Sequence, residues 1–322
     1  MSREFRICRS LEEAAGFGPC ALTIGNFDGV HAGHRSILRR VAEMARAHGW
    51  KPSALTFDPH PAVIVAPERA PRLLTTPEQR AWLMWEEGIE QVLILPFTLE
   101  LSRLTPERFA REILKERLDV RAVVVGENFR FGHRHEGDVQ RLQELGNELG
   151  FMTETLPAVR VRGRVVSSSE IRRLIQAGAV STACRLLERP HWVEGPVQPG
   201  RGEGSRRIVP TLNLAPNELL LPAEGVYITR AMDPTSRRKW PAVTNVGRRP
   251  TFDLEELAVE THLLDSEVSS PPPALRIEFL RWLRPEKKFP DAGALRAQIM
   301  RDIQRAQVYF RRFRHLVKAA AG

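Results

Sequence analysis

One ten-residue segment near the N-terminus limits the possible folds of this chain more than any other. It reads Gly-Asn-Phe-Asp-Gly-Val-His-Ala-Gly-His at residues 25–34, at the end of an apolar, β-rich run and just before apolar residues at helical spacing. Its glycines relax steric limits, so the backbone can approach a bound phosphate closely. The N-terminus of the following helix adds unpaired N–H groups and the positive end of a dipole. The segment therefore predicts a triphosphate-binding turn between a strand and a helix.

The histidines of this segment, His31 and His34, bracket one tight turn. Imidazoles placed there can donate hydrogen bonds to phosphate oxygens while negative charge builds up in a transition state. Adenylyl transfer needs no covalent enzyme intermediate, so positioning, Mg²⁺ and such donors suffice. Two other interpretations remain open: a helix-capping turn with surface histidines, and a metal-binding histidine pair. A zinc site lacks a nearby cysteine and a convincing third ligand.

The first half of the chain alternates strand and helix patterns. Apolar, β-rich runs lie at residues 21–27, 53–57, 91–97 and 122–125. Between them, apolar residues recur at helical spacing around residues 37–44, 81–85 and 109–114. This alternation predicts a parallel, Rossmann-like sheet with crossover helices, whose ligand lies beyond the carboxyl ends of the strands.

The pattern changes after Arg189-Pro190, where short β-like runs are separated by Gly, Pro and Asn. These runs lie at residues 191–197, 208–214, 225–232, 240–246, 257–264 and 274–283. They predict a small antiparallel barrel or sandwich. Apolar residues at Leu295, Ile299, Ile303 and Ala306 then predict a C-terminal helix. We expect two domains, at residues 1–186 and 187–322.

Composition excludes some classes of protein. The 322 residues have an ordinary hydrophobic fraction of 42%, no apolar run near the length of a spanning helix, and no apolar signal-peptide core. Three widely spaced cysteines favour a reducing cytoplasm over a disulfide framework. The net charge of +9, part of it in the C-terminal helix, allows a polyanionic ligand, although charge runs usually form solvated helix faces.

Several motifs, taken together, resemble one family over essentially the whole chain, the bacterial bifunctional riboflavin kinase/FAD synthetases. In the first half they are residues 25–34, Thr-Phe-Asp-Pro-His-Pro at 56–61, Val-Gly-Glu-Asn-Phe-Arg-Phe-Gly at 125–132, Gly-Asp at 137–138 and Ser-Ser-Ser-Glu-Ile-Arg at 167–172. In the second half they are residues 210–214, 221–222 with 225–227, 245–247 with 250–252, 259–262 and 283–289. The resemblance implies an α/β nucleotidylyltransferase domain followed by a β-barrel riboflavin kinase domain with a C-terminal helix.

In the first domain the resemblance implies a site that adenylylates FMN, with His31, His34 and Asn128 as catalytic residues. It assigns ATP binding to Gly25, Asn26, Phe27, Asp28, Gly29, His31, His34, Ser167, Ser168, Ser169 and Arg172. It assigns flavin binding to Phe57, Pro59, His60, Asn128 and Arg130. Asn128 stands where the family commonly has Asp, so it keeps the hydrogen-bonding shape without the charge. From the residues alone, the serine run could equally be a plain helix N-cap.

In the second domain the resemblance implies a riboflavin kinase site. Gly204, Thr211 and Asn213 would bind ATP, and Thr211 and Asn213 would also bind Mg²⁺. Glu260 would accept the proton of the ribityl hydroxyl, and Arg284 would bind flavin. From the pattern alone, an outward-facing strand residue would be the favoured interpretation of Glu260. Ser205 and Ile208 depart from the usual Arg and Gly, and the usual Tyr-Gly pair after the catalytic strand is replaced by a Ser-Pro-rich loop.

The leading hypothesis is an enzyme that phosphorylates riboflavin to FMN and adenylylates FMN to FAD, using ATP and Mg²⁺. One alternative keeps only FAD synthesis, because Ser205 and Ile208 depart from the kinase pattern. Others are a non-catalytic flavin- or RNA-binding regulator, and a related transferase with another acceptor. We expect a cytoplasmic monomer or weak homo-oligomer with riboflavin, FMN and ATP as partners, and with no nucleic-acid or membrane partner.

Overall fold

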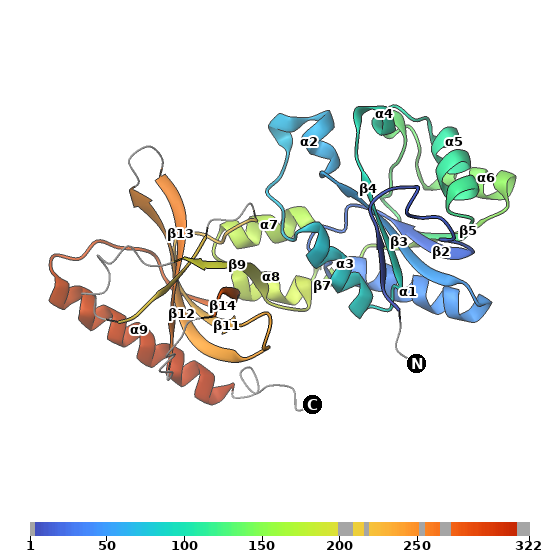
Figure 1. The fold of residues 1–322 in the computed structure, drawn as a ribbon. Helices are drawn as coiled ribbons and strands as arrows, with labels where there is room; N and C mark the ends of the chain where they lie inside the picture. Colours follow the sequence, from blue (N-terminus) through green and yellow to red (C-terminus); the bar gives the residue numbers. More distant parts are fainter. Residues whose placement is uncertain (1–3, 199–208, 216–218, 251–254, 265–271, 314–322) are drawn as a thin grey trace. The chain divides into compact units, whose positions relative to one another are not determined.

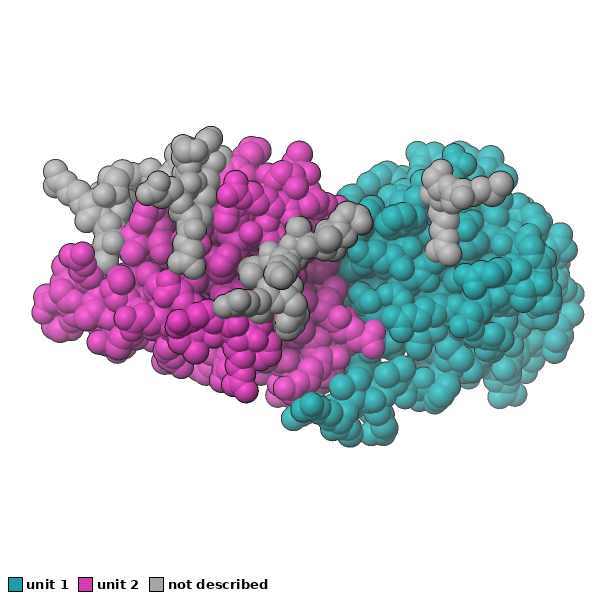
Figure 2. Space-filling model, turned by 90° about the horizontal axis from the view of Figure 1, so that it is seen from below, with its two compact units in different colours: residues 1–168 teal, residues 169–322 magenta. Residues whose placement is uncertain are grey.

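The computed structural model describes residues 4–198, 209–215, 219–250, 255–264 and 272–313. The chain divides into two compact units, residues 1–168 and 169–322, which Figure 2 shows in different colours. The second unit begins at residue 169, and the predicted functional boundary between residues 186 and 187 stays a prediction. Within the second unit, α8 (Val180–Leu187) packs with the barrel, and the Ile175 carbonyl of α7 (Ser168–Gln176) accepts the Ala223 N–H at 3.2 Å. For example, Ser181 Oγ of α8 donates to the Leu280 carbonyl at 2.9 Å.

A parallel six-stranded sheet forms the centre of the first unit (Figure 1). Its strands are β1 (Arg6–Cys8), β2 (Cys20–Ile24), β3 (Lys51–Asp58), β4 (Gln91–Pro96), β5 (Val120–Gly126) and β6 (Met152–Leu156), in the spatial order β1-β4-β3-β2-β5-β6. The four predicted strands are confirmed as β2 to β5. The two edge strands were missed because β1 has only three residues and β6 alternates polar side chains at a partly exposed edge.

Helices cover the sheet and connect its strands. They are α1 (Ala32–His48), α2 (Pro61–Val65), α3 (Pro77–Glu86), α4 (Leu99–Ser102), α5 (Pro106–Arg108), a π-helix (Phe109–Arg117) and α6 (Val139–Leu149), with short 3₁₀ turns at Pro67–Arg69 and His133–His135 and a small hairpin of β7 (Arg160–Val161) and β8 (Arg164–Val165). Alternate residues of the strands, such as Leu22 and Val123, pack against the π-helix and α6 in one core. No helix in the described ranges is long and apolar enough to span a membrane.

The strand order places the turn at residues 25–34 at the centre of the sheet. β2 pairs with β3 on one side and with β5 on the other, so the direction in which strands are added reverses at β2. At such a switch point the connections that leave the carboxyl ends of adjacent strands run to opposite faces of the sheet. A crevice for a ligand remains between them. The motifs that follow β2, β3 and β5 therefore meet at one edge.

The second unit contains a closed antiparallel barrel and one long helix. The strands are β9 (His191–Gln198), β10 (Leu212–Leu214), β11 (Gly225–Met232), β12 (Lys239–Pro250), β13 (Glu255–Leu263) and β14 (Ala274–Arg284), in the order β10-β13-β12-β11-β14-β9. The prediction of a small antiparallel β domain is confirmed as a barrel.

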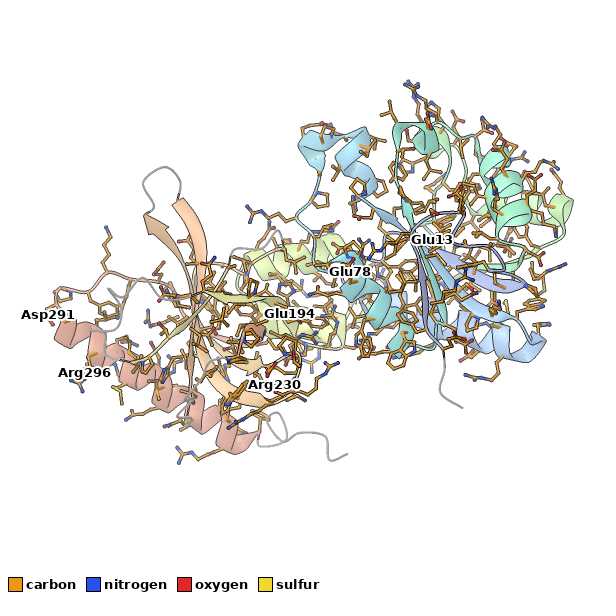
Figure 3. All side chains as sticks on the ribbon, in the orientation of Figure 1. Glu13, Glu78, Glu194, Arg230, Asp291 and Arg296 are labelled. Atoms are coloured by element: carbon orange, nitrogen blue, oxygen red, sulfur yellow. The ribbon has the colours of Figure 1, made fainter. Side chains whose placement is uncertain are left out.

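The C-terminal helix α9 (Ala292–Arg312) confirms the predicted helical pattern. Asp291, labelled with Arg296 in Figure 3, begins it by accepting the Ala294 N–H at 2.7 Å. Its apolar residues, including Ile303 and Phe310, pack on the barrel around Ile228 and Leu280. This contact fixes one face of the helix against the barrel.

Candidate active sites

The turn after β2 has an unusual backbone. Phe27, Gly29 and Val30 have φ angles of 48°, 85° and 39°, all in the left-handed region. Phe27 and the β-branched Val30 tolerate this region poorly, so surrounding contacts must hold the turn in shape. The Gly25 N–H donates to the Leu55 carbonyl at 3.1 Å, and the Val30 N–H donates to the Phe27 carbonyl at 3.0 Å. The result is a constrained turn at the N-terminus of α1.

The Asp28 carboxylate links this turn to residues 74 and 75 through hydrogen bonds. It is buried, and it accepts hydrogen bonds from the Leu74 N–H at 3.0 Å and from the N–H and hydroxyl of Thr75, both at 3.1 Å. Thr75 Oγ1 in turn accepts the Gly29 N–H at 3.0 Å. The Asp28 carbonyl accepts the hydroxyl of Ser168, the first residue of α7, at 2.8 Å. Asp28 therefore supports the turn, and its predicted contact with ATP stays a prediction.

His31 and His34 form a stacked pair at the start of α1. Their ring centroids lie 3.6 Å apart with an interplanar angle of 15°. His31 Nδ1 accepts the backbone N–H of His34 at 3.2 Å, so neutral His31 carries its proton on Nε2. A Cβ at Gly33 would lie 3.2 Å from the His31 ring, so the glycine permits this arrangement. His31 is therefore the N-cap of α1, as one of the open interpretations expects, and its Nε2 is a hydrogen-bond donor.

His31 is buried, whereas His34 is partly buried, with its Nδ1 atom enclosed. His34 differs from its neighbour in its hydrogen bonding. Its Nδ1 has no hydrogen-bond partner among the described residues, and its ring meets the edge of Phe27 at 5.0 Å. Burial, followed by the positive charges of His31 and Arg80, holds the pKa of His34 well below the usual 6.5. His34 is therefore a neutral imidazole at physiological pH.

This burial gives the first unit a pH-dependent stability. Unfolded His34 takes up a proton near pH 6.5, whereas folded His34 stays neutral, so the unfolded state binds more protons below that pH. The free energy of unfolding should fall as pH decreases from about 6.5, by at most about 1.4 kcal/mol per pH unit from this residue. Pulse proteolysis in urea at about pH 7.5 and about pH 5.5 measures it, and His34→Gln should show the smaller fall. Equal falls in both proteins would contradict the assignment.

The motif after β3 reaches the same turn. His60 Nε2 lies 3.3 Å from Asn26 Nδ2, and His60 Nδ1 accepts the Ala62 N–H at 3.2 Å, which caps α2. Phe57 packs edge-on against Phe97 with ring centroids 5.4 Å apart. The structure therefore joins the predicted ATP residue Asn26 to the predicted flavin residue His60. Pro59, which precedes His60 in the chain, is exposed.

The motif after β5 forms a second tight turn, closed by the Phe129 N–H on the Gly126 carbonyl at 3.0 Å. Asn128 is exposed in it, at the carboxyl end of the strand. Arg130 is exposed and pairs with Asp138 at 3.4 Å. Asp138 also caps α6 through the Arg141 N–H at 2.9 Å. These residues lie at the expected edge of the sheet, and the catalytic role of Asn128 stays a prediction.

The third motif is divided between the units. Ser168 contacts the turn through Asp28, as described above, and Ser167 precedes it. Ser169 and Arg172 lie farther along α7, within the second unit. Their part in the ATP site stays a prediction.

The register of the barrel aligns the predicted kinase residues in one row. Asn213 pairs with Glu260, and Glu260 pairs with Asn245 on the next strand. Asn245 pairs with Val226, which pairs with Arg284. Cross-strand partners present their side chains on the same face. Glu260 therefore lies in one cross-strand row with Asn213 and Arg284.

A cavity of about 370 Å³ lies between this row and α9. Thr211, Glu260 and Arg284 line it. Its wall also includes apolar side chains and two polar residues that the sequence analysis did not assign to a site: Val209, Val226, Val243, Leu295, Ile299, Ile303, Asn245 and Glu286. Such a wall can accept a flat aromatic ring at one end and a polar chain at the other.

Polar contacts fix the rim of the cavity. His262 Nδ1 lies 2.8 Å from the Pro210 carbonyl, next to Thr211. Asn245 Nδ2 donates to Glu286 Oε1 at 3.4 Å. The remaining kinase residues of interest, Gly204, Ser205 and Ile208, lie outside the described residues.

Arg284 forms an ion pair that the sequence did not predict. Its Nε donates to Asp302 Oδ2 of α9 at 2.8 Å, and the two side chains are 15% and 3% exposed. Asp302 also accepts Gln298 Nε2 at 2.9 Å. No local pattern in the sequence indicates this pair, because its members lie on different elements 18 positions apart. The guanidinium therefore ties α9 to the cavity wall.

Breaking this pair should affect only the kinase. Asp302→Ala leaves Arg284 buried without its partner, which costs about 3–5 kcal/mol. We expect the second unit to unfold at lower urea concentration and the KM for riboflavin to rise, with FAD formation from added FMN unchanged. Steady-state kinetics and pulse proteolysis measure both effects. The double variant Asp302→Leu with Arg284→Met is the matched control and should recover stability, and a double variant as unstable as Asp302→Ala would contradict the role of the pair.

Comparisons with known proteins match both halves of the chain. A family model described as FAD synthetase matches residues 15–170, and a model described as riboflavin kinase matches residues 187–310. The bifunctional riboflavin kinase/FMN adenylyltransferase of Pseudomonas fluorescens is 36% identical over 289 residues, which cover 89% of this chain and 92% of that protein. The protein of the same name from Escherichia coli K12 is 32% identical over 291 residues, or 90% and 93% of the two chains.

A solved structure supports the fold. The crystal structure of a protein named macrolide-efflux protein, from Streptococcus pneumoniae, matches with a TM-score of 0.84 and covers 94% of this chain and 98% of that chain. Its sequence identity of 24% limits the comparison to the fold. The two family models and the relatives confirm the prediction of a two-domain transferase of flavin synthesis. The chain belongs to the bifunctional riboflavin kinase/FMN adenylyltransferase family.

Proposed function

We propose that the first unit binds the triphosphate of ATP at the turn at residues 25–34 and transfers AMP to FMN there. The observation that carries this proposal is the stacked pair of His31 and His34 at the N-terminus of α1. Aromatic residues at the ends of β3 and β5, among them Phe57 and Phe129, offer a surface for the flavin ring, with Phe129 stacked on Phe131 at 5.6 Å.

In the transfer, a phosphate oxygen of FMN forms a bond to the α-phosphorus of ATP. The bond from that phosphorus to the oxygen bridging it to the β-phosphorus breaks, and pyrophosphate leaves. Negative charge builds on the phosphate oxygens during this exchange. Neutral His31 can donate from Nε2, and His34 sits beside it in a dry environment where hydrogen bonds are strong.

We propose that the second unit phosphorylates riboflavin in the cavity beside Glu260. The terminal ribityl hydroxyl gives its proton to the Glu260 carboxylate as its oxygen forms a bond to the γ-phosphorus of ATP, and ADP leaves. The apolar wall and α9 would hold the flavin ring, while Asn245 and Glu286 lie near its polar edge. The cross-strand row from Asn213 to Arg284 supports this arrangement.

Mg²⁺ fits the oxygen atoms that the kinase site offers. Thr211 supplies a hydroxyl, and Asn213 lies opposite Glu260 across β10 and β13. Among the described residues, no group of three or more His, Cys, Asp or Glu side chains could hold a metal ion. Mg²⁺ commonly uses one or two protein oxygens together with substrate phosphates, whose charge it neutralises. We therefore propose Thr211 and Asn213 as its protein ligands, with ATP completing the set.

The decisive test follows the products of purified protein incubated with riboflavin, ATP and Mg²⁺. Chromatography should show FMN first and FAD afterwards. FAD formed only from added FMN would support the alternative of an FAD synthetase without a working kinase. Neither product from either substrate would support the non-catalytic regulator and would sink the proposal.

We further propose a cytoplasmic monomer or weak homo-oligomer that uses riboflavin, FMN and ATP, without a nucleic-acid or membrane partner. Cys8, Cys20 and Cys184 are all free thiols, which supports a reducing compartment. Burial raises the pKa of Cys20 to about 12, so this thiol is unreactive. We retain 186/187 as the functional boundary, supported by the start of the riboflavin kinase match at residue 187.

A further inference from the structure

Arg80 is a buried cation that forms no ion pair with the described residues, and the carboxylates of Asp28, Asp58 and Glu78 attract it only from beyond ion-pair distance. It lies on α3, and its side chain is among the largest that are fully buried in the chain. Its Nη1 donates to the Asn26 carbonyl at 2.7 Å and to Thr56 Oγ1 at 3.2 Å. Its Nε and Nη2 have no hydrogen-bond partner within the part of the chain that is described. A buried guanidinium stays charged, and burying a charge without a partner is costly.

The nearby carboxylates are already occupied or exposed. Asp28 is engaged by the hydrogen bonds from Leu74 and Thr75. Glu78 pairs with Arg9 at 2.6 Å. Asp58 is exposed at the end of β3. Within the described residues, none of them forms an ion pair with Arg80. Burial outweighs their attraction and lowers the pKa of Arg80, so a further anion nearby would stabilise its charge.

The position of Arg80 indicates which anion that is. The Asn26 carbonyl, which Arg80 contacts, belongs to the turn at residues 25–34 and also accepts the Thr56 hydroxyl at 3.1 Å. The Asn26 side chain lies against His60 at 3.3 Å. Arg80 is also close enough to His34 to help lower the pKa of that residue. The guanidinium therefore lies directly behind the turn, where charges interact strongly because water is excluded.

We propose that Arg80 is a positioning residue for adenylyl transfer: its guanidinium fixes Asn26 and supplies the positive charge that the triphosphate of ATP neutralises from the other side of the turn. The inference rests on the placement of ATP at this turn under the proposed function. Arg80 does not touch the reacting atoms. It acts through the Asn26 carbonyl and through its electrostatic field, and bound ATP adds negative charge to that of the more distant carboxylates.

The test compares Arg80→Met and Arg80→Lys with Arg69→Met, which removes one charge from an arginine that is 85% exposed. The readouts are kcat and the KM for ATP in FAD formation from FMN, with riboflavin phosphorylation by the same chain as the internal control. Arg80→Met should lower kcat/KM for ATP by about a hundredfold or more, with a raised KM. Arg80→Lys keeps the charge but loses the fork that bridges Asn26 and Thr56, so it should mainly lower kcat.

A purely structural role predicts a different result. Arg80→Met would then be less stable, but below its melting temperature it would keep the wild-type kcat and KM, and that outcome overturns the proposal. If Arg80→Met does not fold, Arg80→Lys decides: wild-type kcat and KM overturn the proposal, and a lowered kcat with normal riboflavin phosphorylation supports it. His31→Ala separates this inference from the placement of ATP. If His31→Ala forms FAD at the wild-type rate, both the placement of ATP at the turn and the role of Arg80 are wrong. If His31→Ala is inactive and Arg80→Met is active, only the role of Arg80 is wrong.

Discussion

Replacing His31 with alanine should lower FAD formation from FMN by about 10²–10³-fold. The change removes the Nε2 donor, the N-cap of α1 and the ring that stacks on His34 at 3.6 Å. The loss should fall mainly on kcat, because charge on the phosphate oxygens grows in the transition state. Phosphorylation of riboflavin should keep its wild-type rate, since His31 lies in the first unit. Separate assays with FMN and with riboflavin measure the two activities.

His48→Ala is the matched control for this experiment. His48 is the last residue of the same helix, is exposed, and stacks on Trp50 at 4.4 Å. It should keep both activities. If His31→Ala formed FAD at the wild-type rate, ATP would not react at this turn, and the stacked histidines would be only a helix cap.

Replacing Glu260 with glutamine should strongly reduce the phosphorylation of riboflavin to FMN. The amide keeps the size of the side chain but cannot accept the hydroxyl proton, so FMN formation from riboflavin should fall by about 10²–10⁴-fold. FAD formation from added FMN should be unchanged. Binding of riboflavin should also be retained, because the apolar wall and the pair between Arg284 and Asp302 are untouched. Flavin fluorescence titration and chromatography of the products measure binding and turnover.

Glu224→Gln provides the matched control, since Glu224 is an exposed carboxylate just before β11 and outside the row of cavity residues. It should phosphorylate riboflavin normally. The assignment of Glu260 would be wrong if Glu260→Gln kept normal turnover. Loss of both activities in both His31→Ala and Glu260→Gln would contradict two independent sites.

Much of this architecture follows from local patterns in the sequence. The strands β2 to β5 and all six barrel strands lie where β-rich runs indicated them, because burial imposes a recognisable spacing on each element. The edge strand β6 escaped prediction because its exposed, polar side chains carry no such spacing. The helices α7 and α8 have clear helical patterns, but a pattern does not reveal whether a helix packs with the unit before it or the unit after it.

Some of the site residues could be predicted from the sequence, and others could not. The glycine–histidine turn and the motifs after β3 and β5 could be recognised because each is a short, continuous segment at the end of a strand. Asn245 and Asp302 could not, because each joins the kinase cavity only through strand register or through packing of α9. The motif could not show either that the Asp28 carboxylate accepts hydrogen bonds from residues 74–75, because those residues lie more than 40 positions away.

The sequence by itself determined that residues 25–34 form a turn between a strand and a helix, since glycine freedom and apolar spacing act over a few neighbouring residues. It also determined the two chemical modules and their order. Only the tertiary structure decided which distant side chains meet there. Arg80 reaches Asn26 across 54 positions of sequence, and the burial of its Nε and Nη2 without a hydrogen-bond partner among the described residues is visible only once α3 is packed against the sheet. Burial is a property of the whole fold, so no local pattern could have predicted it.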